Sequence, residues 1–277
     1  MTLRPHRSVL YVPADKPRAM EKAAGLDADA VIFDLEDAVA PEAKDDARDH
    51  LADALGRDWG RKLRLVRVNG AGTPWHGADL ALAERTRPDA VLLPKVGGAE
   101  AVALAAGALP RQVAVWAMIE TPAGVLAAPA IAAAPRMGGL VMGTNDLAKE
   151  LRSHGRAALA CALQRTVLAA RAAGIVAIDG VCNAFRDEDA LRAECAEGRA
   201  FGFDGKSLIH PLQIAVANAA FGPSEEEIDL ARRQIAAFEA AEAEGKGVAV
   251  LDGRIVESLH VAEARRVMAM ADAVAAR

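Results

Sequence analysis

The sequence is poor in residue types that cross-link small proteins or stack on nucleic-acid bases. It has three cysteines, one tyrosine and three tryptophans among 277 residues, and its net charge is −5. An odd number of cysteines without CxxC spacing disfavours a disulfide framework or a zinc site, so we expect Cys161, Cys182 and Cys195 to be buried thiols. A negative net charge with few aromatic side chains disfavours binding to nucleic acid.

Long hydrophobic runs are also absent. No apolar run approaches the roughly 20 residues that a membrane span needs, and the first residues lack the small-residue cleavage site of a signal peptide. A composition of 52% apolar and 26% charged residues is typical of a globular protein. We therefore expect a cytoplasmic protein that binds neither membranes nor nucleic acid.

Short apolar runs recur along the chain, each followed by a segment with helical spacing. This alternation is typical of parallel βα units. We predict eight strands, at residues 8–13, 30–36, 64–69, 90–95, 114–120, 139–143, 175–181 and 203–209. Eight such units indicate a (β/α)8 TIM barrel, and a doubly wound open sheet with a similar local pattern is the alternative.

The chain continues beyond the eighth unit with a C-terminal helical extension. An amphipathic helix capped by Ser224, with Glu227 three residues later, is followed by a short hairpin and a last helix. This tail is too small to form its own core, so we expect it to pack on the barrel or on an adjacent subunit. The predicted domains are a catalytic barrel of residues 1–222 and an extension of residues 223–277.

Nearly every predicted strand ends in polar residues that a buried core would not select. The buried run 30–33 is followed at once by Asp34, Glu36 and Asp37. Other strand ends carry Arg67, Asn69, Lys95, Glu120, Asp146, Asp179, Lys206 and His210. In a barrel these ends converge on the one mouth where such folds hold their chemistry. A single acid there is as well explained as a helix cap, but charges at six or seven strand ends favour a site.

Two of these carboxylates predict a metal site. Glu120 ends the fifth strand and Asp146 follows the sixth, and neighbouring strands place them side by side. Two carboxylates with water and a chelating substrate form the oxygen-rich site that Mg²⁺ prefers, and the absence of His or Cys beside them disfavours zinc. Two mutually repelling helix caps are the alternative. Arg67 at the same mouth could stabilise an oxyanion, in particular an enolate.

Basic residues near the first and eighth strands predict a rim that binds phosphate groups. Lys16, Arg18 and Lys22 follow the first strand, and Lys206 lies near the eighth. These strands adjoin in a closed barrel, so the side chains could share one rim, although a solvated helix face explains Arg18 and Lys22 equally well. His210 is either structural or a ligand contact. No GxGxxG or P-loop is present, so no nucleotide-binding motif is assigned.

Ordered segments along almost the whole chain resemble the citrate lyase β-subunit and malyl-CoA lyase family of the HpcH/HpaI aldolase superfamily. They include RSVLYVPADKPRAMEKA, ADAVIFDLEDAVAPEAKDDAR, LVRVNGAGTPWHGADL, IETPAGV, GTNDLAKEL and GFDGKSLIHPLQIAVAN. The resemblance implies a (β/α)8 barrel that assembles as a homotrimer or hexamer. It also implies a Mg²⁺-dependent lyase that cleaves citramalyl-, malyl- or citryl-CoA to acetyl-CoA and a 2-keto acid.

The resemblance further implies roles for particular residues in the barrel mouth. Glu120 and Asp146 would bind the metal, while Glu36 and Asp37 would hold its waters. Arg67 would face the thioester oxygen and take the negative charge that develops there. The metal would lower the pKa of the substrate hydroxyl and organise the leaving keto acid.

Residues outside this centre receive roles in the same way. Lys16, Lys206 and His210 would lie along the CoA rim. Glu257 stands where the family has a tail Asp, often lent by an adjacent subunit, that protonates the enolate. Asn145 stands where many relatives carry Glu. These two departures bear on the identity of the acid, on the preferred substrate and on the charge beside the metal.

Two other activities and one inactive state are alternatives to the CoA-thioester lyase. An aldolase acting on free 4-hydroxy-2-keto acids has the same barrel and metal pair, but such enzymes typically carry His where this chain has Asp37. A β-subunit of a carrier-dependent citrate lyase would be inactive alone on CoA esters. A non-catalytic scaffold is disfavoured because the charged strand ends are retained.

Overall fold

A computed structural model describes residues 4–276 of the chain. By its internal packing the described part of the chain divides into two compact units, one formed by His6–Asn218 and the other by residues 219–276 with residues 4–5. The boundary predicted at residue 222 stays a prediction.

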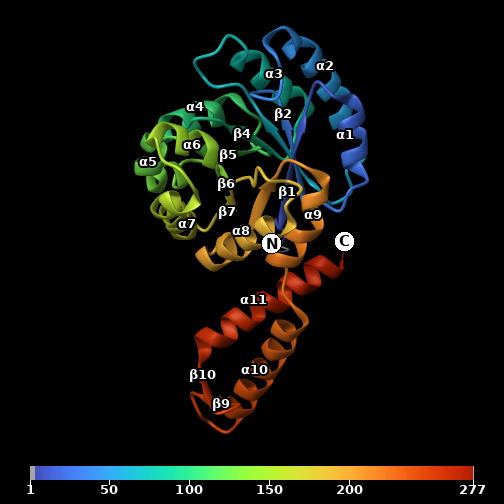
Figure 1. Cartoon of the computed structure of the whole chain (residues 1–277). Helices are drawn as coiled ribbons and strands as arrows, with labels where there is room; N and C mark the ends of the chain where they lie inside the picture. Colours follow the sequence, from blue (N-terminus) through green and yellow to red (C-terminus); the bar gives the residue numbers. More distant parts are fainter. Residues whose placement is uncertain (1–3, 277) are drawn as a thin grey trace. The chain divides into compact units, whose positions relative to one another are not determined.

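Eight parallel strands close into a barrel in the first unit (Figure 1). They are β1 (Ser8–Pro13), β2 (Ala30–Asp34), β3 (Leu63–Arg67), β4 (Ala90–Leu93), β5 (Ala114–Ile119), β6 (Met137–Met142), β7 (Val176–Asp179) and β8 (Gly205–Leu208). Each strand pairs with the next, and β1 also pairs with β8. The predicted (β/α)8 TIM barrel is confirmed, and the open sheet is excluded.

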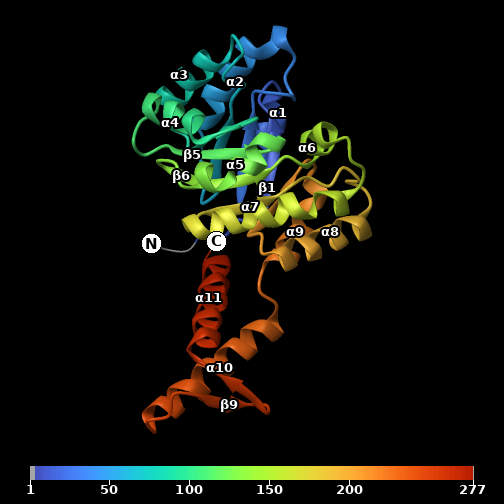
Figure 2. The same ribbon diagram turned by 90° about the vertical axis from the view of Figure 1, so that its left-hand side faces the viewer.

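Helices follow the strands and surround the barrel (Figure 2). They are α1 (Pro17–Ala24), α2 (Lys44–Leu55), α3 (His76–Thr86), α4 (Ala99–Ala108), α5 (Pro122–Ala132), α6 (Thr144–Leu151), α7 (Ala160–Ala173), α8 (Glu188–Phe201) and α9 (Ile214–Phe221). Short 3-10 turns occupy Pro41–Ala43, Arg156–Leu159 and Pro211–Gln213. No helix within residues 4–276 is long and apolar enough to cross a membrane.

Side chains that alternate along each strand fill the barrel interior. The core includes Val9, Ala30, Ile32, Leu63, Leu65, Leu92, Trp116, Met118, Val141 and Ile178. Because residues two apart on a strand face the same side, the next inward positions are Asp34 on β2, Arg67 on β3 and Glu120 just after β5. The two-residue period thus turns these three charged side chains into the mouth.

The second unit contains α10 (Glu225–Ala243), β9 (Ala249–Leu251), β10 (Arg254–Val256) and α11 (Ser258–Ala275). Ser224 and Glu227 form the predicted capping box at the start of α10. We expected no core here, but Phe238, Ala241, Ala249, Val256 and Val261 form a small buried cluster. The hairpin supplies the apolar cover that the helices alone lack.

The cysteine prediction is correct for two of the three residues. Cys182 and Cys195 are buried thiols, whereas Cys161 is exposed on α7. The helical spacing of the apolar residues around Cys161 did not show which side of α7 faces solvent.

Candidate active site

Arg67 occupies the centre of the barrel mouth and is held there by carboxylates. Its Nε and Nη2 donate to the two oxygens of Asp34 at 2.8 and 2.6 Å, a bidentate pair in which both side chains are buried. Its Nη1 lies 2.9 Å from Glu36 Oε2, and its guanidinium lies 5.0 Å from the centre of the Tyr11 ring. Arg67 is therefore a fixed positive charge facing the cavity.

Glu36 is fixed in the loop after β2, which is itself tied down from behind. Buried Lys44 donates to the carbonyl oxygens of Leu35 and Glu36 at 2.8 and 2.9 Å, and Asn69 donates to the Leu35 carbonyl at 2.9 Å. The Glu36 side chain also accepts from Lys95 Nζ at 2.6 Å. A loop this well bonded keeps Glu36 beside Arg67 without help from a ligand.

Glu120 is buried with one oxygen left unpaired. Its Oε1 accepts the backbone N–H of Lys95 at 2.7 Å, while Oε2 is buried without a hydrogen-bond partner. The pKa of Glu120 is raised to about 7, chiefly by burial. The hydrogen bond from the Lys95 N–H favours the charged form and lowers the pKa, whereas the negative charges of Glu36 and Asp146 raise it further. An unpaired buried carboxylate oxygen is unfavourable alone and suits a cation.

The chain leaves room for this carboxylate at Gly143, just after β6. A Cβ built on Gly143 would lie 2.3 Å from Glu120 Oε2 and 2.4 Å from Glu120 Cβ. No other residue type fits there unless Glu120 moves. Asp146 follows in the first turn of α6, where it lines the same cavity as Glu120.

The cavity has a volume of about 400 Å³ and contrasting walls. Its charged lining consists of Asp34, Asp37, Arg67, Glu120 and Asp146. Its apolar lining includes Met118, Met142, Val181 and Ile209, together with the ring of Tyr11. The excess of carboxylates suits a cation, and the apolar wall suits an apolar portion of a substrate.

Glu120 and Asp146 are the pair that could hold a divalent ion. Within the described part of the chain, no group of three or more His, Cys, Asp and Glu side chains is placed to hold a metal. Two carboxylates suffice for Mg²⁺, which keeps several waters and takes the remaining oxygens from its substrate. The unpaired Glu120 Oε2 and the space left by Gly143 fit such an ion.

The structure brings most of the predicted site together. Arg67 contacts Glu36, and Lys95 links Glu36 to Glu120. The cavity lining includes Arg67 and Glu120 together with Asp37 and Asp146. The roles predicted for these residues in metal binding and catalysis stay predictions.

Three predicted residues have other local surroundings. Lys16 is exposed at the start of α1 and pairs with Asp15 at 2.6 Å. His210 caps the turn after β8 and stacks on Phe185, with ring centres 4.6 Å apart. Glu257 is exposed at the N-cap of α11 in the second unit. Their predicted contacts with CoA or with an enolate stay untested.

The predicted rim role of Lys206 is wrong. Its side chain is fully buried, with Nζ 2.9 Å from Asp179 Oδ2 and 2.9 Å from Glu194 Oε2. Asp179 also pairs with Arg156 at 2.9 Å, and Arg156 pairs with Glu197. Because Ile178 faces the core, Asp179 and its register partner Lys206 face outward, toward α8. We call these five residues the closed network.

Three contributors to the site have no role in the sequence-based prediction. Asp34 and Lys95 are charged strand ends without an assigned role, although they hold Arg67, Glu36 and Glu120. Tyr11 is predicted only as part of a strand. The two-residue period along β1 and β2 could have placed Tyr11 and Asp34 inward, but no sequence signal gives the backbone contact of Lys95.

Known proteins with similar sequences act on CoA esters. A (3S)-malyl-CoA thioesterase of Cereibacter sphaeroides is 56% identical over 276 residues, which cover 98% of this chain and 96% of that protein. An L-malyl-CoA/beta-methylmalyl-CoA lyase of the same species is 34% identical over 99% of this chain and 96% of its own length.

A solved structure shares the fold and the sequence pattern. CitE from Mycobacterium tuberculosis, in complex with magnesium, acetoacetate and coenzyme A, matches with a TM-score of 0.81 and 34% identity, covering 98% of this chain and all of that one. The family model for HpcH/HpaI aldolase/citrate lyase matches residues 7–211. The chain therefore belongs to the HpcH/HpaI aldolase/citrate lyase family.

Proposed function

We propose that this enzyme hydrolyses the thioester bond of malyl-CoA, or of a closely related 3-hydroxy-carboxyacyl-CoA, with the help of Mg²⁺. The observation that carries the choice of reaction is the 56% identity, over 98% of the chain, to a (3S)-malyl-CoA thioesterase. Water adds to the thioester carbon, the carbon–sulfur bond breaks, and CoA and free malate leave. The arrangement around Arg67 and Glu120 supports a reaction that builds negative charge on the thioester oxygen.

The Mg²⁺ ion would be held by Glu120 and Asp146, with Glu36 and Asp37 on its waters. Magnesium also accompanies CoA in the CitE structure that resembles this chain. When bound, Mg²⁺ supplies a charge that orients a hydroxyl and its neighbouring carboxylate and lowers the hydroxyl pKa. Glu120 offers the ion an oxygen that has no other partner.

Arg67 would stabilise the thioester oxygen as it becomes negative. Its Nε and Nη2 are taken by Asp34, so the guanidinium is oriented before substrate arrives and need not reorganise during the reaction. The same placement serves a tetrahedral oxyanion in hydrolysis and an enolate in carbon–carbon cleavage. Arg67 therefore supports thioester chemistry but does not select one reaction.

Carbon–carbon cleavage of the same substrate, predicted from the sequence, is the second candidate. It is favoured by the 34% identity to an L-malyl-CoA/beta-methylmalyl-CoA lyase. In that reaction the substrate hydroxyl loses its proton, acetyl-CoA leaves as an enolate sheltered by Arg67, and an acid such as Glu257 must protonate it. Hydrolysis needs no such acid.

Product analysis separates the two reactions. The purified chain is incubated with (3S)-malyl-CoA and Mg²⁺ in H₂¹⁸O, and free thiol, glyoxylate, acetyl-CoA and malate are measured together. Hydrolysis gives equal amounts of thiol and malate, with one ¹⁸O in the malate. Acetyl-CoA alone serves as the control substrate. Glyoxylate and acetyl-CoA without free thiol would establish cleavage in place of hydrolysis, and no turnover would reject both.

We also propose that the enzyme works in the cytoplasm as a homotrimer or hexamer. The assembly rests on the family resemblance of the sequence motifs, and the location on the sequence-based expectation given above. Light scattering of the purified chain tests the assembly, and a monomer at micromolar concentration would contradict it. Fractionation of the source cells tests the location.

A further inference from the structure

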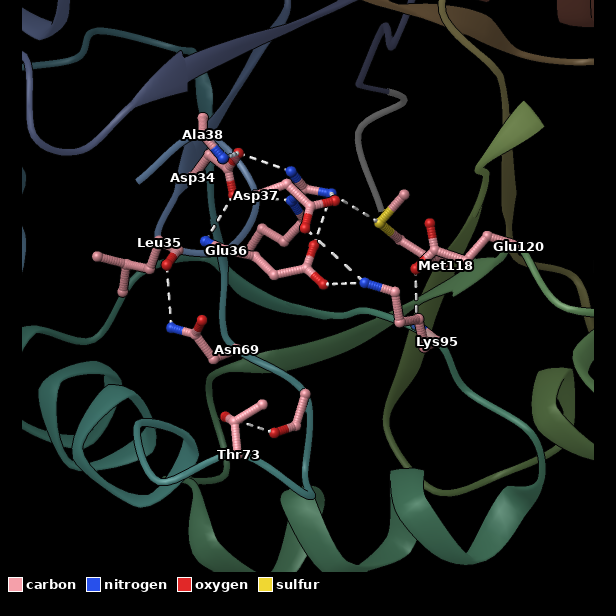
Figure 3. Close-up of polar contacts among 12 residues, drawn as sticks. Asp34, Leu35, Glu36, Asp37, Ala38, Asn69, Thr73, Lys95, Met118 and Glu120 are labelled. Carbon is pink, nitrogen blue, oxygen red and sulfur yellow. Dashed lines mark hydrogen bonds and ion pairs between the residues drawn. The ribbon is translucent and has the colours of Figure 1, made fainter. Parts of the chain in front are cut away.

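Lys95 has an unusual backbone for its residue type. It follows Pro94 directly after β4, and its φ is 51°, in the left-handed region that favours glycine. Non-glycine residues held in this region cluster at functional sites, because the surrounding structure must compensate for the strain. Lys95 also lies among the site residues in Figure 3.

The side chain of Lys95 holds one carboxylate. Its Nζ donates to Glu36 Oε1 at 2.6 Å and lies 3.8 Å from Asp37 Oδ1. The other oxygen of Glu36 lies 2.9 Å from Arg67 Nη1. Glu36 thus lies between two cations, and without the ammonium its Oε1 loses this hydrogen-bond partner.

The backbone of Lys95 holds the other carboxylate. Its N–H donates to Glu120 Oε1 at 2.7 Å, while Glu120 Oε2 has no hydrogen-bond partner. The residue that supplies this N–H is the one with the left-handed backbone. One residue therefore bonds to two carboxylates through two separate groups (Figure 3).

We propose that Lys95 is the positioning residue of this site: its left-handed backbone presents Glu120 Oε2 to the metal, and its ammonium keeps Glu36 in place beside Arg67. The proposal rests on the proposed function, because it assigns Glu120 to the metal. If only the backbone mattered, glycine could replace Lys95 without loss, because glycine suits a positive φ. If only the ammonium mattered, a cation at another position could replace it. Two tasks at one position require both the turn and the ammonium.

Three variants separate the two tasks. Lys95→Gly and Lys95→Met remove the ammonium and tolerate the left-handed turn at least as well as lysine does. Lys95→Ile removes the ammonium equally but is β-branched, which strongly disfavours a positive φ. Methionine and isoleucine are matched in charge and close in size, so their difference reports the backbone alone.

The backbone task is read from Mg²⁺ binding without substrate, by calorimetry. We expect Lys95→Gly and Lys95→Met to bind Mg²⁺ within about threefold of the unmodified chain, and Lys95→Ile to bind about tenfold more weakly. Circular dichroism checks that each variant is folded. The backbone role is wrong if Lys95→Ile binds Mg²⁺ as tightly as Lys95→Met. It is also wrong if Lys95→Ile is unfolded and Lys95→Gly, which suits the left-handed turn, loses Mg²⁺ affinity.

The side-chain task is read from turnover and from chemical rescue. Lys95→Gly and Lys95→Met should each lose about 10- to 100-fold in kcat/KM with saturating Mg²⁺. Because the lysine side chain is 46% exposed, n-butylammonium can enter the space left in Lys95→Gly and should restore activity several-fold. It should not restore Lys95→Met, whose own side chain fills the space. Equal responses of the two variants to the amine would overturn this role.

The readouts also separate this proposal from the proposed function. Calorimetry needs no substrate, so the isoleucine effect stands even if malyl-CoA is not the substrate. If the unmodified chain binds Mg²⁺ and turns over malyl-CoA but all three variants match it in both measurements, the proposed function stands and the role of Lys95 is rejected.

Discussion

Two clusters of charged side chains are built around strand ends of the same barrel, and one of them lines the cavity described above. The open cluster contains Asp34, Glu36, Arg67, Lys95 and Glu120, and part of it lines the mouth. The closed network contains Arg156, Asp179, Glu194, Glu197 and Lys206 and lies behind β7 and β8. Both consist of cations and carboxylates in contact.

The two clusters differ in whether each carboxylate oxygen has a cation or a hydrogen-bond partner. In the closed network, Asp179 Oδ2 meets two cations, and Glu194 Oε2 lies 2.9 Å from Lys206 although it forms no aligned hydrogen bond. In the open cluster, Glu120 Oε2 has neither a hydrogen bond nor a cation within ion-pair distance. Burial of charge alone therefore does not indicate a site, whereas a buried charge left incomplete beside a cavity does.

The largest expected effect lies in the closed network. Lys206→Met leaves Asp179 buried with one cation fewer and should lower the free energy of unfolding by about 3–5 kcal/mol. The folded variant should keep its kcat/KM within about threefold, since this lysine faces away from the cavity. Urea denaturation and initial rates provide the two measurements. A lost activity with unchanged stability would place Lys206 in the site after all.

Arginine replacement tests the same contrast with a matched pair. Arg67→Lys loses the bidentate grip of Asp34 and should lower kcat/KM by about 10²- to 10³-fold, as removal of an oxyanion donor does. Arg156→Lys makes the same change in the closed network and should affect stability but hardly alter kcat/KM. Steady-state rates with (3S)-malyl-CoA test this, and equal losses in the two variants would remove the distinction.

Glu120→Gln should trade function for stability. The pKa of Glu120 is raised to about 7 in the fold, from an ordinary 4.5. Between these two pH values the folded protein holds a proton that the unfolded chain has released. The metal-free protein therefore loses stability as the pH rises from 4.5 to 7, and glutamine should recover up to about 3 kcal/mol at pH 8 but nothing below pH 4.5.

Thermal melts at several pH values, with and without Mg²⁺, check this. Glu120→Gln should also lose the stabilisation that Mg²⁺ gives to the unmodified chain. Glu194→Gln is the control from the closed network and should gain nothing at pH 8, because Lys206 already compensates its charge. A Glu120→Gln variant that melts lower than the unmodified chain at pH 8 would contradict the cost assigned to this carboxylate.

The smallest expected effect concerns an acid outside both clusters. Glu257→Gln should leave thioester hydrolysis within about threefold, since hydrolysis requires no proton donor for an enolate. Any acetyl-CoA formed by the second reaction should fall more steeply. Parallel measurement of free thiol and acetyl-CoA tests this, and an equal loss of both products would assign Glu257 to a step that the two reactions share.

Much of the site was predictable because its signals are local. The paired acids Glu120 and Asp146 and the central Arg67 follow from strand ends that converge in a barrel, and the structure places all three at one cavity. The sequence does not show that Lys206 lies within β8 with its side chain on the outer face of the barrel. Lys95 received no role because its decisive contact uses a backbone N–H, which every residue except proline possesses.

The sequence by itself determined the strands, the barrel and the charges carried at its mouth, since apolar periodicity and strand ends are properties of neighbouring residues. Only the tertiary structure decided which of those charges face the cavity. That choice depends on register: Asp34 continues the inward series of β2, whereas Asp179 lies one position after inward-facing Ile178. A shift of the strand register by one residue would turn a side chain from the cavity to the helix layer. The pairing of Ser8 with Lys206, where β1 closes on β8, is part of what fixes this register.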